Sequence, residues 1–214
     1  MSCCRCVWED CGRCRRLAGD RRAGRRQDSV TTQRDLIESS RSRYAQLQVD
    51  VVRLVGRLSG PQLAWAPPDG GWSVAQVLEH LTVVNEQYLR EIHARLDHDP
   101  PMRRSADTEW RPSLAGRLLA HAMVNPRKMK SPRGWRPGSV VRDRPLESFT
   151  RTLGELSAGL DRADEVDLRR ARTRSPASRL IWLNLGDAFE LQALHAERHL
   201  GQIRRIMSRP EFPG

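Results

Sequence analysis

The chain has 214 residues and a formal net charge of +11, and this length suits one domain with a single hydrophobic core. No apolar run approaches the roughly 20 residues of a membrane-spanning helix, and the N-terminus has no hydrophobic signal core. The sequence therefore predicts a cytoplasmic protein without a membrane partner.

The first 29 residues differ from the rest of the chain in composition. They are rich in arginine and hold all five cysteines, four of which form two closely spaced pairs, Cys3-x2-Cys6 and Cys11-x2-Cys14. Only four residues separate the pairs, whereas paired zinc knuckles usually stand about 15–20 residues apart. Nothing nearby could form a core, so we expect a disordered tail here rather than a metal site.

Residue Val30 begins a segment that is typical of a bacterial N-terminus. We therefore hypothesise that residues 1–29 are a mis-assigned start. The sequence then predicts one domain at residues 30–209, followed by a short tail at residues 210–214.

The first predicted helix spans about Thr32 to Arg57, because apolar residues recur there at steps of three and four. The pair Gly60-Pro61 is expected to end it. The stretch Leu63–Trp72 contains two prolines and two adjacent glycines, which exclude a helix and predict a loop.

The second predicted helix runs from Val74 to about Leu96. Ser73 is a suitable N-cap, and Gln76 three residues later completes a capping box. His80 lies on the flank of the apolar stripe, at the border of the groove towards a neighbouring helix. A lone histidine there is usually a packed or capped side chain, so it becomes a candidate ligand only if others join it.

A short helix and a long loop follow. Residues 113–124 are expected to form the short helix, with His121 off its apolar stripe as a reserve ligand. The loop at 125–144 carries the densest basic cluster outside the tail, including Lys130, and also Trp135. Long loops in compact domains are often functional. Both a solvated loop and an anion-binding lid over a substrate remain open.

The last third of the chain predicts two more long helices. Pro145 is well placed at the first position of one of them. Residues 161–176 are expected to be a charged linker outside the core, and the final helix is expected at 178–207, with a bend near Gly186. No β-alternation is convincing, so the fold class is all-α. It is a four-helix bundle with one short extra helix.

The final helix carries two histidines that share one face. At about 100° per residue, His195 and His199 lie one above the other on a stripe that also holds Leu191 and Ile206, so the stripe should face the interior. Two inward imidazoles at i and i+4 can offer two nitrogen ligands to one metal. A pair of packed histidines is the alternative. Glu197 projects roughly 160–200° away, which excludes the H-E-x-x-H mechanism of metalloproteases.

Two segments taken together resemble the DinB/YfiT-like superfamily, in its DinB-2 branch: Gly71-Trp72-Ser73-Val74 … Val77-Leu78-Glu79-His80-Leu81 and His195-x3-His199-Leu200-x-Gln202-Ile203. The likeness covers about residues 32–207. It implies a four-helix bundle in which a divalent metal is held by one histidine of the second helix and two of the last. In this sequence those ligands would be His80, His195 and His199.

The resemblance also implies an activity, that of a transferase acting through a low-molecular-weight thiol (mycothiol or bacillithiol) or that of a metal-dependent hydrolase. Zn, Ni, Fe and Mn all suit three imidazoles, and three ligands leave a position for water or a thiolate. Gln202, one turn beyond His199, could bind a ligand or orient an imidazole. Lys130 and Trp135 of the basic loop are further candidates for supporting the ligands or binding substrate, and the loop around Lys130 could meet an anionic substrate or thiol cofactor.

Two other classes of function remain open. A non-enzymatic metal-binding protein, acting in a stress response or an interaction, is compatible with the sequence because no carboxylate is an evident general base. Nucleic-acid binding is the weaker alternative. Residues 1–29 contribute eight arginines and four acidic residues, so the remainder carries about +7, without a helix-turn-helix or an aromatic RNA platform. We expect a small-molecule substrate and no nucleic acid, and the long helices are compatible with a homodimer.

Overall fold

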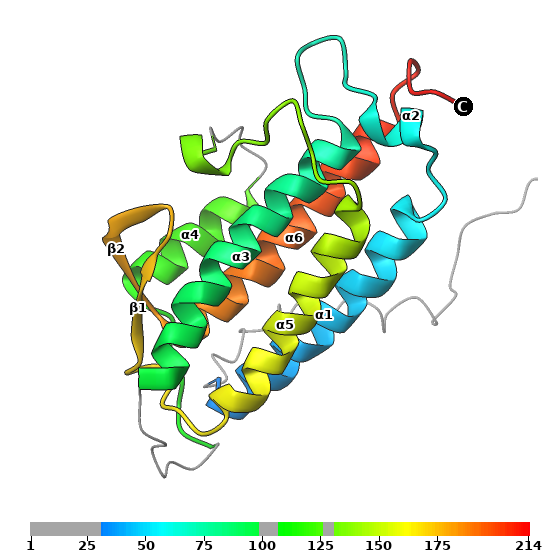
Figure 1. Ribbon diagram of the computed structural model, residues 1–214. Helices are drawn as coiled ribbons and strands as arrows, with labels where there is room; N and C mark the ends of the chain where they lie inside the picture. Colours follow the sequence, from blue (N-terminus) through cyan, green and yellow to red (C-terminus); the bar gives the residue numbers. More distant parts are fainter. Residues whose placement is uncertain (1–30, 99–106, 126–130) are drawn as a thin grey trace, which may run out of the picture. The chain divides into compact units, whose positions relative to one another are not determined.

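Four long helices lie side by side as a bundle in the computed structural model, which describes residues 31–98, 107–125 and 131–214 (Figure 1). The four are α1 (Gln33–Val55), α3 (Val74–His98), α5 (Pro145–Ala163) and α6 (Leu185–Met207). Helices α1 and α3 each pack against both α5 and α6, so every helix has two neighbours. The predicted all-α four-helix bundle is confirmed. The predicted tail at residues 1–29 lies outside the described residues.

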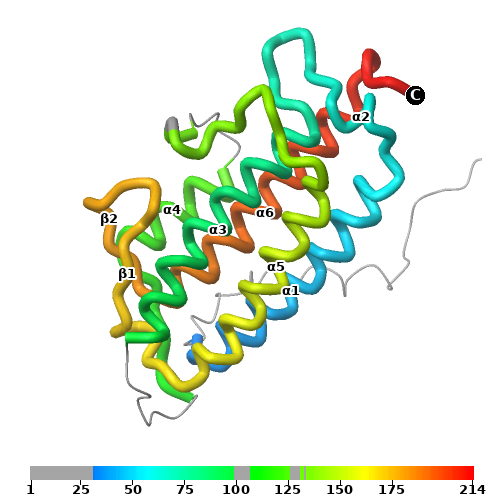
Figure 2. Tube along the Cα trace, in the orientation of Figure 1, coloured from blue at the N-terminus to red at the C-terminus, as the bar shows by residue number. Residues whose placement is uncertain are grey.

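The direction of the helices is visible in the colour order of the chain (Figure 2). Helices α1 and α6 run one way, and α3 and α5 run the other way. The neighbours α3 and α5 are therefore parallel, and a long connection must return the chain to the end of the bundle where α3 began. The short helix α4 (Leu114–Val124) and residues 131–144 belong to this connection.

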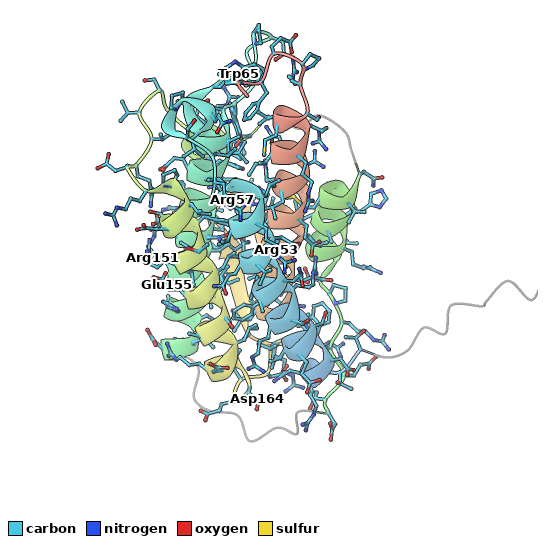
Figure 3. The ribbon with its side chains drawn as sticks, turned by 90° about the vertical axis from the view of Figure 1, so that its right-hand side faces the viewer. Arg53, Arg57, Trp65, Arg151, Glu155 and Asp164 are labelled. Carbon is cyan, nitrogen blue, oxygen red and sulfur yellow. The ribbon has the colours of Figure 1, made fainter. Side chains whose placement is uncertain are left out.

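The core is built from the apolar stripes that the sequence pattern predicts. Helix α1 lies between α5 and α6; Arg53 points outwards from it, and Arg57 lies in the turn after its end (Figure 3). On its inner face, Tyr44 is fully buried and donates a hydrogen bond from its hydroxyl to the Phe189 carbonyl over 2.7 Å. Each buried Leu or Phe side chain stabilises the bundle by about 1.5–3 kcal/mol relative to exposure.

A short helix, α2 (Gly60–Ala64), follows α1 and includes the first two residues of the loop expected at Leu63–Trp72. The prediction that Gly60-Pro61 merely ends the first helix is wrong, because that helix already stops at Val55 and the two residues begin a new one. Ser59 and Gln62 form a capping box at its start. Proline fits the first turn since its missing N–H would have no partner there.

The largest correction concerns residues 161–184. A β-hairpin of β1 (Arg172–Ser175) and β2 (Ser178–Asn184) occupies the end of the expected linker and the first two turns of the expected last helix, and residues 161–163 still belong to α5. Its alternation was hard to see because the inward residues of β1, Thr173 and Ser175, are small and polar. Leu168 is fully buried as well, so this stretch belongs to the core.

The other boundaries agree closely with expectation. Pro145 lies in the first turn of α5, and α4 occupies most of the expected short helix. Gly186 is the second residue of α6 rather than a bend within it. Among the residues described, no helix combines the length and the apolar character that crossing a membrane would require.

Candidate metal centre

Helix α3 presents the first histidine of the site. The expected capping box is present. The Gln76 backbone N–H donates to the Ser73 hydroxyl, and the Gln76 side-chain oxygen accepts from the Ser73 backbone N–H. This box fixes where α3 begins and therefore which way each later residue faces. His80, two turns further on, is only 3% exposed. It points into the bundle towards α6.

Helix α6 presents the other two. Asn184 caps its N-terminus and forms a capping box with Asp187, which places His195 and His199 one turn apart on the face towards α3. His195 is 6% exposed, and His199 is half-buried. The interior position predicted for this pair agrees with the structure.

The three imidazoles form one cluster. One ring nitrogen from each of His80, His195 and His199 lies within 4.8 Å of the other two. The Nε2 atoms of His80 and His195 are 3.1 Å apart. Two nitrogens at about 2.0–2.1 Å from a tetrahedral zinc ion would stand about 3.3–3.4 Å apart, so this spacing is close to that of a ligand pair.

Hydrogen bonds fix the orientation of two of the rings. His80 donates from Nδ1 to the Trp135 carbonyl over 2.6 Å, and His199 donates from Nδ1 to Gln202 Oε1 over 2.8 Å. A neutral imidazole that donates from Nδ1 carries its lone pair on Nε2. Both rings are therefore held with the lone pair of Nε2 turned away from the Nδ1 acceptor, the usual arrangement around histidine-bound metals.

The third ring, His195, is held differently from the other two. Within the described part of the chain, the buried Nδ1 of His195 has no hydrogen-bond partner, and its Nε2 faces the Nε2 of His80. With the lone pair of His80 on Nε2, a neutral His195 that is protonated on Nε2 donates a hydrogen bond to it, and a metal ion bound by both rings would replace this bond. The donor set and its geometry thus fit a divalent metal.

Electrostatics keep the cluster in the neutral form that binds metals. Burial lowers the pKa of His80, and the bond to the Trp135 carbonyl opposes only part of this effect. Burial, followed by the charges of His199, His80 and Arg198, holds the pKa of His195 well below its usual value. Burial and the neighbouring His80 lower the pKa of His199 to about 3. The three rings are therefore uncharged near neutral pH, and each has one nitrogen lone pair that a metal could use.

Trp72 forms a wall of the cluster that sequence reasoning did not assign to the site. Its ring centroid lies 5.0 Å from that of His80 and 6.4 Å from that of His199, nearly parallel to the latter. The sequence position of Trp72 could have predicted this contact. An apolar residue directly before an N-cap, here Ser73, often packs back over the first turns of the helix. The tryptophan shields the rings from water.

Residues 131–144, which we call the strap, cross α3 on their way to α5 (Figure 1). The Trp135 indole N–H donates to Gln87 over 2.7 Å, and the Gln76 side chain donates to the Gly138 carbonyl over 3.0 Å. These bonds tie both halves of the strap to α3. They also hold the Trp135 carbonyl against His80.

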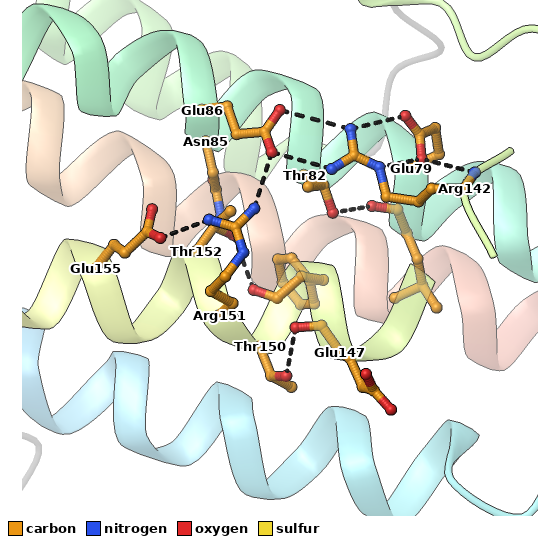
Figure 4. Close-up of polar contacts among 12 residues, drawn as sticks. Glu79, Thr82, Asn85, Glu86, Arg142, Glu147, Thr150, Arg151, Thr152 and Glu155 are labelled. Carbon is orange, nitrogen blue, oxygen red and sulfur yellow. Dashed lines mark hydrogen bonds and ion pairs between the residues drawn. The ribbon is translucent and has the colours of Figure 1, made fainter. Parts of the chain in front are cut away.

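An ion-pair network secures the end of the strap (Figure 4). The Arg142 guanidinium binds Glu79 through Nε at 2.7 Å and Glu86 through Nη1 at 3.0 Å. Arg151 of α5 binds the same Glu86 over 3.0 Å. Burial opposes ionisation of Glu86, but the two arginines outweigh it and lower its pKa. Glu79 directly precedes His80, so the strap is anchored next to the metal-ligand candidate.

The remaining predicted site residues have different outcomes. Gln202 accepts a hydrogen bond from His199, and its role towards a metal or a substrate stays a prediction. Trp135 is buried and accepts a hydrogen bond from His80 through its backbone carbonyl, and its contact with a substrate stays a prediction. Lys130 lies outside the described residues. His121, the reserve ligand, is exposed on α4 and does not belong to the cluster.

Fold and site together define an all-α bundle protein whose interior holds a three-histidine cluster suited to a metal ion. The family model of the DinB superfamily matches residues 43–203, which include the cluster and all four long helices in whole or in part. The chain therefore belongs to the DinB superfamily. Comparison with curated proteins and with solved structures gave no match.

Proposed function

We propose that this protein is a metal-dependent enzyme whose metal is held by His80, His195 and His199. The observation that carries the proposal is the convergence of three ring nitrogens within 4.8 Å, two of them on imidazoles whose Nδ1–H is fixed by an acceptor. A divalent ion bound there would supply a Lewis acid that deprotonates a thiol or a water molecule near neutral pH.

The residues around the cluster support this chemistry in defined ways. Trp72 covers the rings and limits the access of water. Gln202 and the Trp135 carbonyl keep two imidazoles in the tautomer that leaves Nε2 unprotonated. In the described part of the chain no carboxylate joins the cluster, so the nucleophile has to be activated by the metal. A transferase that uses a low-molecular-weight thiol fits best, and a hydrolase uses the same residues.

A non-enzymatic metal-binding role is the second candidate, and one observation favours it. The described residues offer no carboxylate at the cluster that could act as a general base. A sensor or a structural site would need only the three ligands. Turnover of an electrophile with a thiol, measured on metal-loaded protein, separates the two candidates.

The decisive experiment is elemental analysis of the tag-free full chain beside His199→Ala. We expect one equivalent of metal fewer in the variant, while His121→Ala, a control on the exposed face of α4, retains the parent content. Any metal bound by the N-terminal cysteines would be present in the parent and in both variants, so it does not affect the difference in metal content between them. Cobalt substitution adds a check, because cysteine ligation produces a thiolate charge-transfer band and histidine ligation does not. Equal metal content in parent and His199→Ala would refute the proposed site.

A further inference from the structure

A groove of about 230 Å³ lies between α3 and the β-hairpin. It is outside the histidine cluster, and neither the family assignment nor the proposed chemistry involves it. Its lining residues come from two elements far apart in the sequence: Gln87, Arg90 and Glu91 on α3, and Arg174, Ser175, Pro176 and Arg179 on the hairpin.

Positive charge dominates this groove, because three guanidinium groups line it beside a single carboxylate. The nearby Arg142 and Arg151 form ion pairs with Glu79 and Glu86. Arg90, Arg174 and Arg179, in contrast, form no ion pair with any residue that the structure describes. The planar guanidinium fork suits carboxylate and phosphate oxygens.

The arginine on β1 is held in place before any ligand arrives. The Arg174 guanidinium carbon lies 4.6 Å from the centroid of the Trp182 ring, and its Nη1 donates to the Arg179 carbonyl over 3.4 Å. The hairpin is in turn joined to α3, since the Tyr88 hydroxyl and the Ser175 hydroxyl are 3.1 Å apart. Less side-chain entropy is lost when such a group binds an anion.

The groove is connected to the histidine cluster along α3. Gln87, part of its wall, accepts the hydrogen bond from the Trp135 indole, and the Trp135 carbonyl accepts from His80. Gln87 lies seven residues after His80, which is about two turns or 10 Å along the same helix face. This separation is within the length of an extended small molecule.

We propose that this groove binds a carboxylate or phosphate group of the small molecule whose reacting atom lies at the three-histidine site. The inference rests on the proposed function for its link to the cluster. Pockets for whole drug-sized ligands have about 300–1,000 Å³, so a groove of about 230 Å³ suits one anionic group and the atoms next to it.

The test is an NMR titration of the full chain with inorganic phosphate and, separately, with acetate at low ionic strength. We expect saturable shifts of the Gln87, Trp182 and Arg side-chain signals. In the double variant Arg174→Gln/Arg179→Gln the affinity should fall about tenfold or more, because two charge-assisted hydrogen bonds are lost. The control Arg53→Gln, exposed on α1, should bind like the parent (Figure 3).

The groove proposal fails if phosphate and acetate give no saturable shifts, or if the double variant binds them as the parent does. It also fails if the arginines instead bind a single-stranded oligonucleotide far more tightly than phosphate, because the ligand would then be a nucleic acid. Metal content of the same samples keeps the two proposals apart. Absence of metal from the samples would contradict the proposed metal site, whereas absence of anion binding at unchanged metal content would contradict only the groove proposal.

Discussion

Burying three imidazoles in one bundle ties the stability of the metal-free protein to their protonation. In the unfolded chain all three titrate near pH 6.5, while in the folded protein their pKa values are lowered, that of His199 to about 3. Between these limits the unfolded chain binds more protons. The stability is therefore complete above about pH 6.5 and is lost as the pH falls towards the folded pKa values.

The first prediction follows from this difference. Metal-free protein should lose stability below about pH 6.5, at up to about 1.4 kcal/mol per pH unit for each histidine that stays neutral in the fold. Thermal unfolding followed across this range measures the slope. His199→Ala should show a shallower slope, because one of the three groups is gone. Identical slopes would mean that His199 is not held neutral.

The second prediction concerns the side chain that orients His199. Gln202→Ala removes the acceptor at 2.8 Å and frees the ring to rotate, so metal affinity should fall about 10–100-fold with little change of fold. Competition with a chelator of known affinity measures it. Gln46→Ala, on the exposed face of α1, is the matched control. Unchanged affinity in Gln202→Ala would remove Gln202 from the site.

At the level of elements, the strap links the Arg142 ion pair to the position of the ligand candidate His80. Arg142 has no contact with the histidines, but it fastens the segment whose Trp135 carbonyl holds His80. The side chains of Arg142 and Glu79 are 30% and 14% exposed, so the pair is worth more than an open surface contact.

The third prediction tests the strap. Arg142→Gln should destabilise the protein by about 1–3 kcal/mol and weaken metal binding by about threefold to tenfold. Arg144→Gln, in the same segment but with a 75% exposed side chain, should change stability by less than about 0.5 kcal/mol. A loss of stability in Arg142→Gln without any loss of metal affinity would show that the strap does not position His80.

The start of α6 is the second element on which the site depends. Gly186 lies directly against the Trp110 ring, and a Cβ there would come within 2.7 Å of Leu36 Cδ2. Trp110 itself donates to the Asn184 cap over 3.2 Å. The close contact between the start of α6 and Trp110 leaves room only for glycine at position 186. This contact sets the position of α6 and therefore of His195 and His199.

The fourth prediction compares two glycines of the same helix. Gly186→Ala should destabilise by about 1–3 kcal/mol, because the added methyl group overpacks the core. Gly201→Ala meets only the flexible end of Arg205 at 3.6 Å, so it should be neutral or stabilise by up to about 1 kcal/mol through helix propensity. Chemical denaturation of both variants measures the difference, and equal effects would contradict the packing argument.

At the scale of the whole molecule, the proposed ligands come from helices on opposite sides of the crossover. His80 belongs to α3, and His195 and His199 belong to α6. A metal that joins them binds the folded state and not the unfolded chain, so its binding energy adds to the stability of the entire bundle.

The fifth prediction is therefore a thermal shift. Zinc at about 100 times its dissociation constant should add about 2.7 kcal/mol, or about 5–10 °C in the unfolding midpoint for a domain of this size. A chelator should reverse the shift. His199→Ala should show little of it, and an equal shift in that variant would assign the effect to other ligands.

The sequence by itself determined the helical architecture and the histidine set. Hydrophobic periodicity located α1, α3, α5 and most of α6, because a helix that packs on two neighbours must repeat apolar residues every three to four positions. Capping chemistry located the start of α3 through Ser73 and Gln76. The i, i+4 spacing of His195 and His199 placed both on one face, and local geometry is enough for that.

Only the tertiary structure decided what surrounds the histidines. The hairpin at Arg172–Asn184 was missed because its stability comes from pairing and from packing on α3, which leave little pattern in seven or fewer residues per strand. The Trp135 carbonyl is a backbone group, and its contact with His80 spans 55 residues of sequence. Contacts between distant segments depend on how helices pack, and no local pattern in the chain records them.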